Sequence, residues 1–496
     1  LVYAPGDSVG KYGGDIDNWQ WPRHTGDFGF YRAYVAPNGS AADYAETNVP
    51  YKPEHHLKVS AGGLKEGDFV MAAGYPGSTS RYARLAEVEN TFDWQYPTYV
   101  TLLNNWIDTI ENAAPDGSDA RVKYEARLAG LNNYEKNLRG QIAGARSVGL
   151  VQRRREREDA LNAWIAADPS RAHYAADLTA LDALTAESAA AARQDFWYNF
   201  ATNSQLLGTA ERLYRLAKEK EKPNAERESG YQERDMTFFK QGLQALDRRY
   251  DPAVDKAEWM MFLKDYIQQP EAQHVAAFDK ALGLTPNMTD AQLSRKLDAY
   301  YANSTLDETE QRLALMDAST VQIEASKDPF LQLAVALYPH DREQEAESKD
   351  RAGRGLALRP AYMDAIIAWQ RENGKITYPD ANSTLRVTYG TVLGGSPKDG
   401  LVYTPFTTLE GIVAKNTGEE PFNAPERELE LIRAENYGPY ELESIDSVPV
   451  NFLSDLDSTG GNSGSATMNA RGELVGLLFD GTFESVNSDW DFDPRT

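Results

Sequence analysis

The sequence predicts a protein of mixed β and α structure, in which a long helical region is inserted between two β regions. Residues 1–85 are rich in Gly, Pro, Tyr and Trp and contain short strand-like runs. Residues 86–377 consist of long segments of Ala, Leu, Glu, Lys and Arg with helical spacing, and strand-like runs return over residues 378–496. A helical insertion between two β modules explains this order better than three independent domains in a row.

The first β region contains two apolar runs of the kind that form strands. One covers residues 28–35, and the other covers residues 69–73 and is followed by the turn sequence Gly-Tyr-Pro-Gly at 74–77. We interpret residues 1–85 as the C-terminal part of a β domain.

The helical region shows apolar residues that recur every three or four positions between 206 and 216. Farther along, Trp259, Phe262 and Tyr266 step by three and then four residues, which places three aromatic rings on one helix face. An aromatic stripe of this kind is far more often helix packing than a binding surface. We therefore expect these side chains to form a core.

Composition narrows the possible functions. The 75 acidic and 51 basic side chains give a net charge of −24, which argues against nucleic acid and anionic lipid as partners. The sequence contains no uninterrupted stretch of about eighteen apolar residues, so no transmembrane helix is expected. The absence of cysteine excludes disulfides, thiolate catalysis and cysteine metal sites. A length of 496 residues is enough for roughly two to four domains.

The sharpest candidate for chemistry is the loop Thr-Gly-Gly-Asn-Ser-Gly-Ser at 459–465. A nucleophilic serine needs an exposed hydroxyl with backbone N–H groups nearby to hold an oxyanion, and the flanking glycines permit that geometry. Ser463 is the candidate nucleophile, and the N–H groups of Gly461 and Ser463 are the candidate oxyanion donors. The alternative is a flexible turn. Ser465 replaces the last glycine of the α/β-hydrolase elbow and a β hairpin follows, so the loop instead resembles the nucleophile loop of chymotrypsin-like serine peptidases.

A second chemically rich segment covers residues 13–28. It holds two tryptophans, a histidine and three acidic residues, and the alternative to a functional role is a rigid, aromatic-packed loop. Asp27 directly precedes an apolar run, where a buried carboxylate could orient a catalytic imidazole and stabilise its cation.

Together these motifs resemble the bacterial dipeptidyl-peptidases 7 and 11. The resemblance covers both β regions and their order around the helical region. It rests on residues 10–15, 18–28, 74–77, 378–382, 459–465 and 479–481.

The resemblance implies a chymotrypsin-like double β-barrel, incomplete here, with the helical region as a cap. Ser463 would be the nucleophile and Asp27 the orienting acid. The general-base histidine of the family lies upstream of the Asp27 motif, and His24, three residues before Asp27, occupies a different position. We therefore expect the chain to be a fragment, with its C-terminus also incomplete, that lacks amidase activity when expressed alone.

The resemblance also assigns the binding of the substrate's free α-amino group to Asn18, the backbone of Trp19, Asn133 and Asp480. An ammonium needs two or three acceptors including a charge, which Asp480 would supply. A clamp on the N-terminus fixes its distance from Ser463, so the product would be a dipeptide. For Asn133 the alternative is an ordinary amide on a helix surface.

Specificity in this family depends on the residue after the Phe-Asp pair. Arginine there selects acidic residues at P1, the second residue of the substrate, whereas this chain has Gly481. A position without side chain or charge leaves room for a bulky apolar group, so the expected preference is for hydrophobic P1 residues.

The remaining expectations concern partners and location. We expect no cofactor. We also expect no metal, because no His-Glu-x-x-His pattern exists and the adjacent His55 and His56 would point to opposite faces of a strand. The resemblance implies peptide substrates with a free N-terminus, a possible homodimer, and export to the periplasm or cell surface. The alternatives are a chymotrypsin-like endopeptidase and a catalytically silent fragment or helical binding protein.

Overall fold

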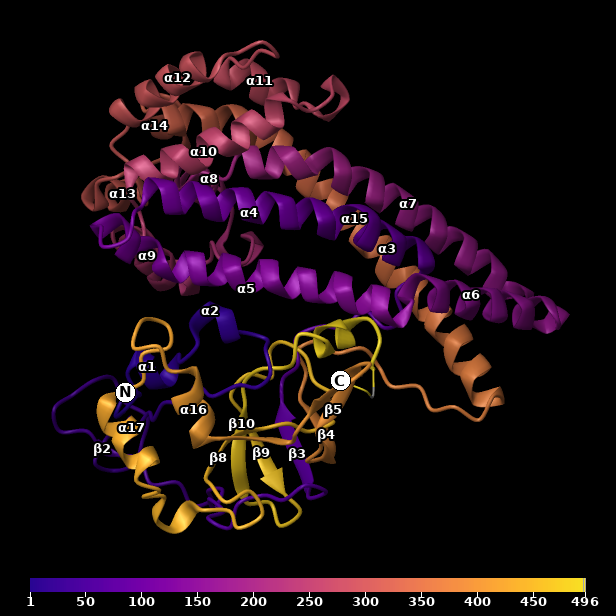
Figure 1. Ribbon diagram of the computed structural model, residues 1–496. Helices are drawn as coiled ribbons and strands as arrows, with labels where there is room; N and C mark the ends of the chain where they lie inside the picture. The colour runs from indigo at the N-terminus through magenta and orange to yellow at the C-terminus, as the bar shows by residue number, and fades with distance from the viewer. Residues whose placement is uncertain (494, 496) are drawn as a thin grey trace. The chain divides into compact units, whose positions relative to one another are not determined.

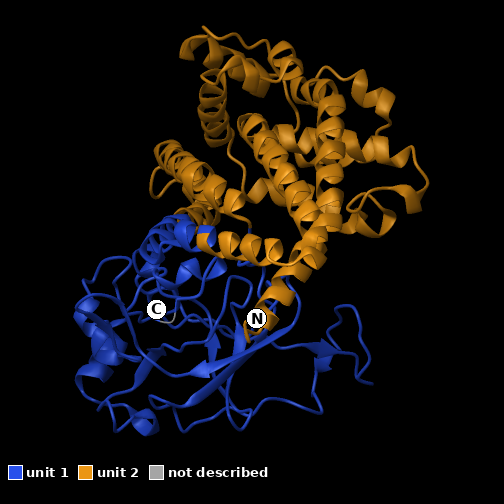
Figure 2. Cartoon of the chain, turned by 90° about the vertical axis from the view of Figure 1, so that its right-hand side faces the viewer, with its two compact units in different colours: residues 1–83, 136–155, 378–496 blue, residues 84–135, 156–377 orange. Residues whose placement is uncertain are grey.

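The computed structural model describes residues 1–493 and 495, and the chain divides into two compact units (Figures 1 and 2). Unit 1 contains residues 1–83, 136–155 and 378–496, and unit 2 contains residues 84–135 and 156–377. The chain thus passes between units at 83/84, 135/136, 155/156 and 377/378, whereas the sequence analysis predicted boundaries at 85/86 and 377/378 only. Residues 136–155, which the sequence analysis placed in the helical region, group with unit 1 and are coloured with it in Figure 2.

Unit 1 is built around a four-stranded antiparallel sheet with the strand order β10-β9-β3-β4. Its strands are β3 (Phe69–Gly74), β4 (Arg386–Thr391), β9 (Ser465–Asn469) and β10 (Leu474–Leu478). Strand β3 therefore lies between two strands that follow it by more than 300 residues, with Ala73 opposite both Val387 and Ala466. The sheet joins the two β regions that the sequence separates.

Three two-stranded antiparallel sheets accompany this sheet in the described part of unit 1. They are β1 (Tyr34–Val35) with β2 (Val49–Pro50), β5 (Gly395–Lys398) with β6 (Leu401–Tyr403), and β7 (Phe406–Thr408) with β8 (Pro449–Phe452). The predicted mixture of β and α structure is confirmed, and the double β-barrel stays a prediction.

The expectation of a strand over residues 28–35 is wrong for most of its length, because only Tyr34 and Val35 form a strand. Apart from an isolated bridge between Tyr3 and Phe30, residues 28–33 have no ladder partner among the described residues. Alternating apolar residues form a strand only where a neighbouring chain accepts their backbone hydrogen bonds.

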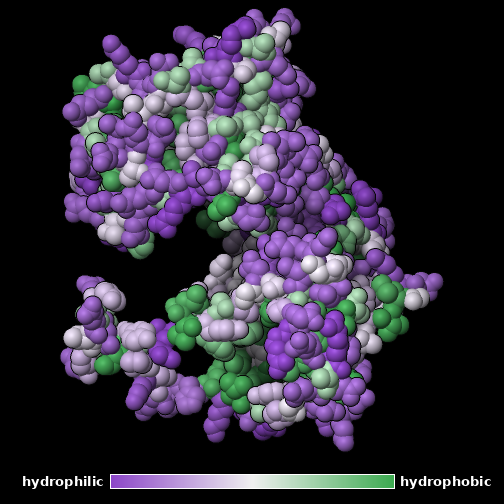
Figure 3. Space-filling model, turned by 60° about the vertical axis from the view of Figure 1, so that its left-hand side comes forward, coloured by the Kyte–Doolittle hydropathy of each residue, from purple (hydrophilic) through white to green (hydrophobic). Residues whose placement is uncertain are grey.

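The core of the sheet lies on one of its faces. Leu64, Val70 and Val392 are buried there and pack with Phe406 and Phe452. On strands β3 and β4, by contrast, Phe69, Val387 and Tyr389 are 42%, 60% and 70% exposed. Figure 3 shows hydrophobic patches among the hydrophilic residues of the surface.

Short helices and the ends of two long ones complete unit 1. The short α-helices are α1 (Asp7–Gly10), α2 (Gly14–Asp17), α16 (Leu409–Lys415) and α17 (Glu426–Arg433), and the 3₁₀ turns are η7 (Gly438–Tyr440) and η8 (Ser485–Asp489). Tyr12, Ile412, Leu429 and Ile432 form a second small core. Residues 136–148 are the second half of α5 (Asp119–Val148), and residues 150–155 are the start of α6 (Leu150–Ala166).

Helix α5 packs closely against the segment that follows Gly481. A Cβ atom on Gly140 would lie 3.2 Å from the ring and the carbonyl oxygen of Phe483, and one on Gly144 would lie 2.6 Å from Cβ of Asn487. Glycine at these two positions, one helical turn apart, therefore permits the helix to approach residues 483–487.

Unit 2 is helical throughout its described elements. Besides parts of α5 and α6 it contains α3 (Leu85–Asn90), the π-helical turn η1 (Thr91–Gln95), α4 (Tyr96–Ala113), η2 (Pro169–Arg171), α7 (Ala172–Ala201), α8 (Gln205–Lys220), η3 (Asn224–Glu226), η4 (Glu233–Asp235), α9 (Met236–Ala245), η5 (Leu246–Arg248), α10 (Pro252–Ile267), η6 (Glu271–Gln273), α11 (Ala276–Leu282), α12 (Asp290–Ala302), α13 (Thr309–Leu315), α14 (Thr320–Glu324) and α15 (Pro329–Glu372).

A large apolar core holds unit 2 together. Leu206, Ala210, Leu213 and Leu216 are buried on α8, which confirms the helical spacing seen in the sequence. Trp259, Phe262 and Tyr266 on α10 are at most 1% exposed, so the aromatic stripe is helix packing as expected. In the described residues, no helix is both long and apolar enough to cross a membrane.

Candidate functional site

The loop before strand β9 presents Ser463 at the surface. Ser463 is exposed, whereas its neighbour Asn462 is buried. The loop is closed by hydrogen bonds from Gly464 N–H to the carbonyl of Leu478 at 2.6 Å and from Ser465 N–H to the carbonyl of Asn462 at 2.9 Å. Gly461 and Gly464 have φ angles of 102° and 85°, which other residues adopt only with strain. The turn therefore requires glycine at positions 461 and 464.

A second glycine-rich segment, residues 74–77, packs against this loop. Gly77 N–H donates to the carbonyl of Gly460 at 2.7 Å. A Cβ atom on Gly461 would lie 2.7 Å from the backbone nitrogen of Gly77 and from the carbonyl oxygen of Tyr75, and one on Gly74 would overlap Oγ of Ser465. The Gly-Tyr-Pro-Gly motif thus fits the loop because Gly74 and Gly461 have no side chains at these contacts.

The backbone N–H groups of Gly461 and Ser463 point to no internal partner. Neither donates a hydrogen bond to any atom of residues 1–493 or 495. Unused amide donors beside an exposed hydroxyl are what an oxyanion hole requires. The two residues that the sequence analysis paired for this role therefore lie in one loop and have their donors available.

Acidic and basic side chains hold the N-terminal side of the loop in place. Thr459 Oγ1 donates to the carboxylate of Asp489, whose pKa is raised by burial. Arg81 donates to both carboxylate oxygens of Asp457 at 2.5 and 2.6 Å, and its backbone N–H donates to Asp380 at 2.9 Å. This network connects the loop to the motif at 378–382.

Residues 13–24 are fixed by three cations that the sequence analysis did not assign. Lys136 on α5 donates to the carbonyls of Asp15 and Ile16 at 2.8 and 2.9 Å. Lys415 on α16 donates to the Asp17 carboxylate at 2.7 Å. The third cation is Arg23, whose Nη1 donates to the Asp17 carbonyl at 2.8 Å. Together these contacts hold the backbone on both sides of Trp19, which has a φ angle of 58°.

Asp480 accepts a hydrogen bond from one of these cations, Arg23, and from two backbone N–H groups. Its Oδ2 accepts from Arg23 Nη1 at 2.6 Å and from Trp19 N–H at 3.2 Å, and its Oδ1 accepts from Gly481 N–H at 2.8 Å. Burial raises the pKa of Asp480, and the Arg23 charge opposes that shift. A Cβ atom on Gly481 would lie 3.6 Å from the Trp19 ring. Trp19, from the motif at 18–28, is therefore a neighbour of Asp480 and Gly481, from the motif at 479–481.

The structure differs from the expectation at Asp27. Asp27 is exposed and hydrogen bonds to no described residue, so the expectation of a buried carboxylate at this position is wrong. The reason is that residues 28–33, which follow it, pair with no sheet that would cover it. Asn18 precedes Trp19 in the motif, and Asn133 lies on α5 in the part that belongs to unit 2.

His24 is packed rather than available. It is 5% exposed and lies against α16, where a Cβ atom on Gly411 would overlap its Nε2. Burial, followed by the charge of Lys415, lowers the pKa of His24 to about 4. The imidazole is therefore neutral near pH 7 and serves as a packing group.

The three cations escaped sequence analysis because a lysine or arginine in a sequence most often indicates a solvated surface. Arg23 offered one signal, since it lies inside the same motif as Asn18 and Trp19. Lys136 and Lys415 lie more than 110 residues from the segment they hold, so no local pattern connects them with it.

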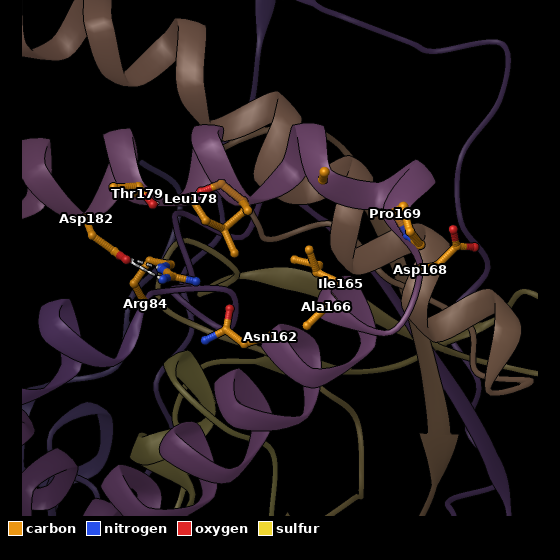
Figure 4. Close-up of a pocket in the computed structure, with 11 residues that line it drawn as sticks. Arg84, Asn162, Ile165, Ala166, Asp168, Pro169, Leu178, Thr179 and Asp182 are labelled. Carbon is orange, nitrogen blue, oxygen red and sulfur yellow. Dashed lines mark hydrogen bonds and ion pairs between the residues drawn. The ribbon is translucent and has the colours of Figure 1, made fainter.

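No three His, Asp or Glu side chains gather in a metal-binding arrangement in the described part of the chain. Figure 4 shows a pocket of about 420 Å³ in unit 2, between α6 and α7. Its arginine, Arg84, is neutralised by Asp182 at 2.8 and 2.9 Å and by Glu158 at 3.5 Å. Arg84 therefore offers no unpaired charge to a ligand in this pocket.

Comparison with known proteins assigns the family. The whole chain, residues 1–496, matches the model of the peptidase S46 family. The chain aligns at 44% identity with the Asp/Glu-specific dipeptidyl-peptidase of Shewanella putrefaciens, covering all of this chain and 70% of that protein. It aligns at 33% identity with the dipeptidyl-peptidase 7 of Porphyromonas endodontalis, covering all of this chain and 59% of that protein. The chain belongs to the peptidase S46 family.

A solved structure agrees with this assignment. The crystal structure of Porphyromonas endodontalis DPP11 in complex with the dipeptide Arg-Glu superimposes with a TM-score of 0.79 at 26% identity. The superposition covers 99% of this chain and 69% of that one. The resemblance inferred from short motifs is therefore confirmed over the full length of this chain.

Proposed function

We propose that these residues form the greater part of a serine-type dipeptidyl-peptidase that releases dipeptides from the free N-terminus of peptides. The observation that carries this proposal is the exposed Ser463 in a glycine-rich loop, beside the two unused amide donors of Gly461 and Ser463. This arrangement suits acyl transfer, because an attacking oxygen and the donors for the resulting oxyanion belong to one rigid turn.

The proposed architecture follows the resemblance. Residues 1–85 would belong to the first barrel of a chymotrypsin-like peptidase, residues 378–496 to the second, and residues 86–377 to the helical cap. The pairing of β3 with both β4 and β9 supports a close union of the two β regions. Asp27 would orient the general base, a histidine that the resemblance places before Asp27 in chain order and outside the six histidines of these residues.

An anchor for the substrate's amino group explains why a dipeptide would be the product. Asp480 supplies the negative charge, and the Trp19 backbone is held beside it by a hydrogen bond of 3.2 Å. Asn18 and Asn133 are added on the resemblance. An ammonium fixed here would leave room for two residues before the bond attacked by Ser463.

Two preferences for the P1 residue can be argued for this chain, one for apolar and one for acidic side chains. Gly481 brings neither charge nor bulk and lies against the Trp19 ring, which favours an apolar P1 side chain. The 44% identity to the Shewanella putrefaciens enzyme, whose name specifies Asp and Glu, favours an acidic one. We propose the apolar preference, because it depends on the residue at the pocket and not on overall similarity.

The test is an assay of the full-length protein that contains these residues. Dipeptidyl substrates with Leu, Met, Asp or Glu at P1 are compared, each with a free and with an acetylated N-terminus, beside Ser463→Ala. Release that requires Ser463 and a free N-terminus supports the peptidase, and cleavage of the acetylated substrates would instead indicate an endopeptidase. Gly481→Arg is the matched variant for the pocket and should shift preference from Leu and Met toward Asp and Glu. Preference of the unmodified enzyme for Asp and Glu would instead establish the acidic P1 preference.

The resemblance also leads us to propose export to the periplasm or cell surface and assembly as a homodimer. Fractionation of the producing cells and light scattering of the purified enzyme would test these two points.

A further inference from the structure

The carboxylate of Asp480 should bind the substrate's ammonium group, but it already forms an ion pair with a cation of the protein itself. Arg23 Nη1 lies 2.6 Å from Oδ2 of Asp480, and both side chains are only 12% exposed. A carboxylate at this depth without a partner would take up a proton and lose its charge. The amino-group anchor therefore needs a neighbour that keeps it ionised.

Arg23 is itself held in a fixed orientation. Its Nη1 also donates to the carbonyl of Asp17 at 2.8 Å, and its guanidinium lies 5.5 Å from the centre of the Phe479 ring. Asp17 is secured in turn by Lys415 at 2.7 Å. Since the residues on both sides of the ion pair are fixed, its geometry does not depend on a flexible side chain in solvent.

The two carboxylate oxygens of Asp480 accept different numbers of hydrogen bonds. Oδ2 accepts hydrogen bonds from Arg23 and from the Trp19 backbone, whereas Oδ1 accepts one, from Gly481 at 2.8 Å. A carboxylate oxygen has capacity for two acceptor bonds. Oδ1 therefore retains acceptor capacity for a further donor.

We propose that Arg23 is a positioning residue for substrate recognition, which holds Asp480 ionised and turned so that Oδ1 receives the α-ammonium group of the peptide. This inference rests on the proposed function, since it assigns a role to Arg23 only if Asp480 binds the amino group. It adds a residue that the family resemblance did not supply.

The surrounding charges make Arg23 the cation that matters for Asp480. Lys415 is occupied by Asp17 and the Pro22 carbonyl, and Lys136 by the Asp15 and Ile16 carbonyls. Glu484, four residues after Asp480 in the chain, pairs with Lys398 at 3.0 Å. Among the described residues, Arg23 alone forms an ion pair with Asp480.

The charge on Arg23 gives the proposal a pH dependence. Burial raises the pKa of Asp480 and Arg23 opposes the shift, so removal of Arg23 should raise that pKa further. Asp480 would then lose its charge at a higher pH. The loss of kcat/KM in such a variant should be greatest on the acid side and smaller as pH rises.

The experiment uses the full-length enzyme with Arg23→Gln, Arg23→Lys, Asp480→Asn and the double variant Arg23→Gln/Asp480→Asn. The kcat/KM of a free-amino dipeptidyl substrate is measured from pH 5 to 9. Arg23→Gln should lower kcat/KM by roughly 10- to 100-fold at the acid end, the range expected for a hydrogen bond to a charged group. Arg23→Lys, which keeps the charge, should retain an acid limb close to that of the unmodified enzyme.

The outcomes separate this inference from the proposed function. If Asp480→Asn leaves kcat/KM unchanged, the amino-group anchor itself is wrong. If Asp480→Asn impairs the enzyme but Arg23→Gln lowers activity equally at every pH, or adds its full effect in the Asp480→Asn background, Arg23 has only a structural role and the inference is overturned. Should Arg23→Gln not fold, Arg23→Lys decides: an acid limb unlike that of the unmodified enzyme overturns the proposal.

Discussion

At the scale of single residues, the loop that presents Ser463 depends on where side chains are absent. Gly461 has a φ angle of 102°, and a Cβ atom there would approach Tyr75 and Gly77 to 2.7 Å. We expect Gly461→Ala to destabilise the protein by about 1–3 kcal/mol and to abolish most peptidase activity, because the loop must shift to remove the overlap.

The neighbouring glycine provides a matched control for this variant. A Cβ atom on Gly460 would meet no other atom within 4 Å, so Gly460→Ala should fold and turn over nearly as the unmodified enzyme does. Thermal unfolding and dipeptide release are measured for both variants. Equal behaviour of the two would show that the close approach at Gly461 is not essential.

Single residues also mark the limit of sequence analysis at this site. Ser463, Gly461, Trp19 and Asp480 could be selected as candidates because each lies in a short motif with an unusual composition. The lysines that fix the loop around Trp19 could not, because the energy of a cation on a backbone carbonyl depends on distance in space. Asp27 was placed correctly next to an apolar run, but its burial required a strand partner that the run does not find in the described structure.

At the scale of elements, helix α16 docks on residues 12–24 through Tyr12, Lys415 and the uncharged imidazole of His24. Tyr12 donates to the carbonyl of Ile412 at 2.8 Å, and His24 lies against Gly411. Burial lowers the pKa of His24 to about 4, below the usual value of about 6.5 in an unfolded chain. The unfolded state therefore binds a proton between these two pH values while the folded state does not, so stability should fall as pH decreases from 6.5 toward 4.

His24→Gln should reduce this dependence on pH. The expected difference between unmodified protein and variant is on the order of 3 kcal/mol at most across the interval, at about 1.4 kcal/mol per pH unit. Chemical unfolding at several pH values measures it, and His173→Gln, at an exposed histidine, is the control. A pH profile of His24→Gln that parallels that of the unmodified protein would contradict the assignment.

Elements also differ in how far the sequence predicts them. The repeats at 206–216 and 259–266 identified buried helix faces, because a helix with one apolar face must cover it. The same reasoning did not reveal that residues 136–155 join the β unit. Helical periodicity indicates which face is apolar and not which partner covers it, and glycines at 140 and 144 were the one local sign of a close contact.

At the scale of the whole molecule, each unit has its own core. Unit 2 is held by the large cluster around Trp259 and Phe330, whereas unit 1 relies on smaller clusters around Val70 and Ile412. Separate cores predict separate cooperative transitions in calorimetry. Helices α5 and α6 each contain residues of both units, which should make the transitions overlap without merging them.

Trp259→Ala tests this prediction. The ring is fully buried, packs against Phe330 at 5.3 Å between ring centres, and donates from Nε1 to the Ala201 carbonyl at 2.8 Å. Its removal should cost unit 2 about 3–5 kcal/mol, and Trp259→Phe, which keeps most of the volume but loses the donor, about 1–2 kcal/mol. The transition of unit 2 should move to lower temperature in this order while that of unit 1 stays within a degree or two, as roughly expected for an indirect effect. A single transition that shifts as a whole in both variants would show instead that the continuous helices make the two units one cooperative structure.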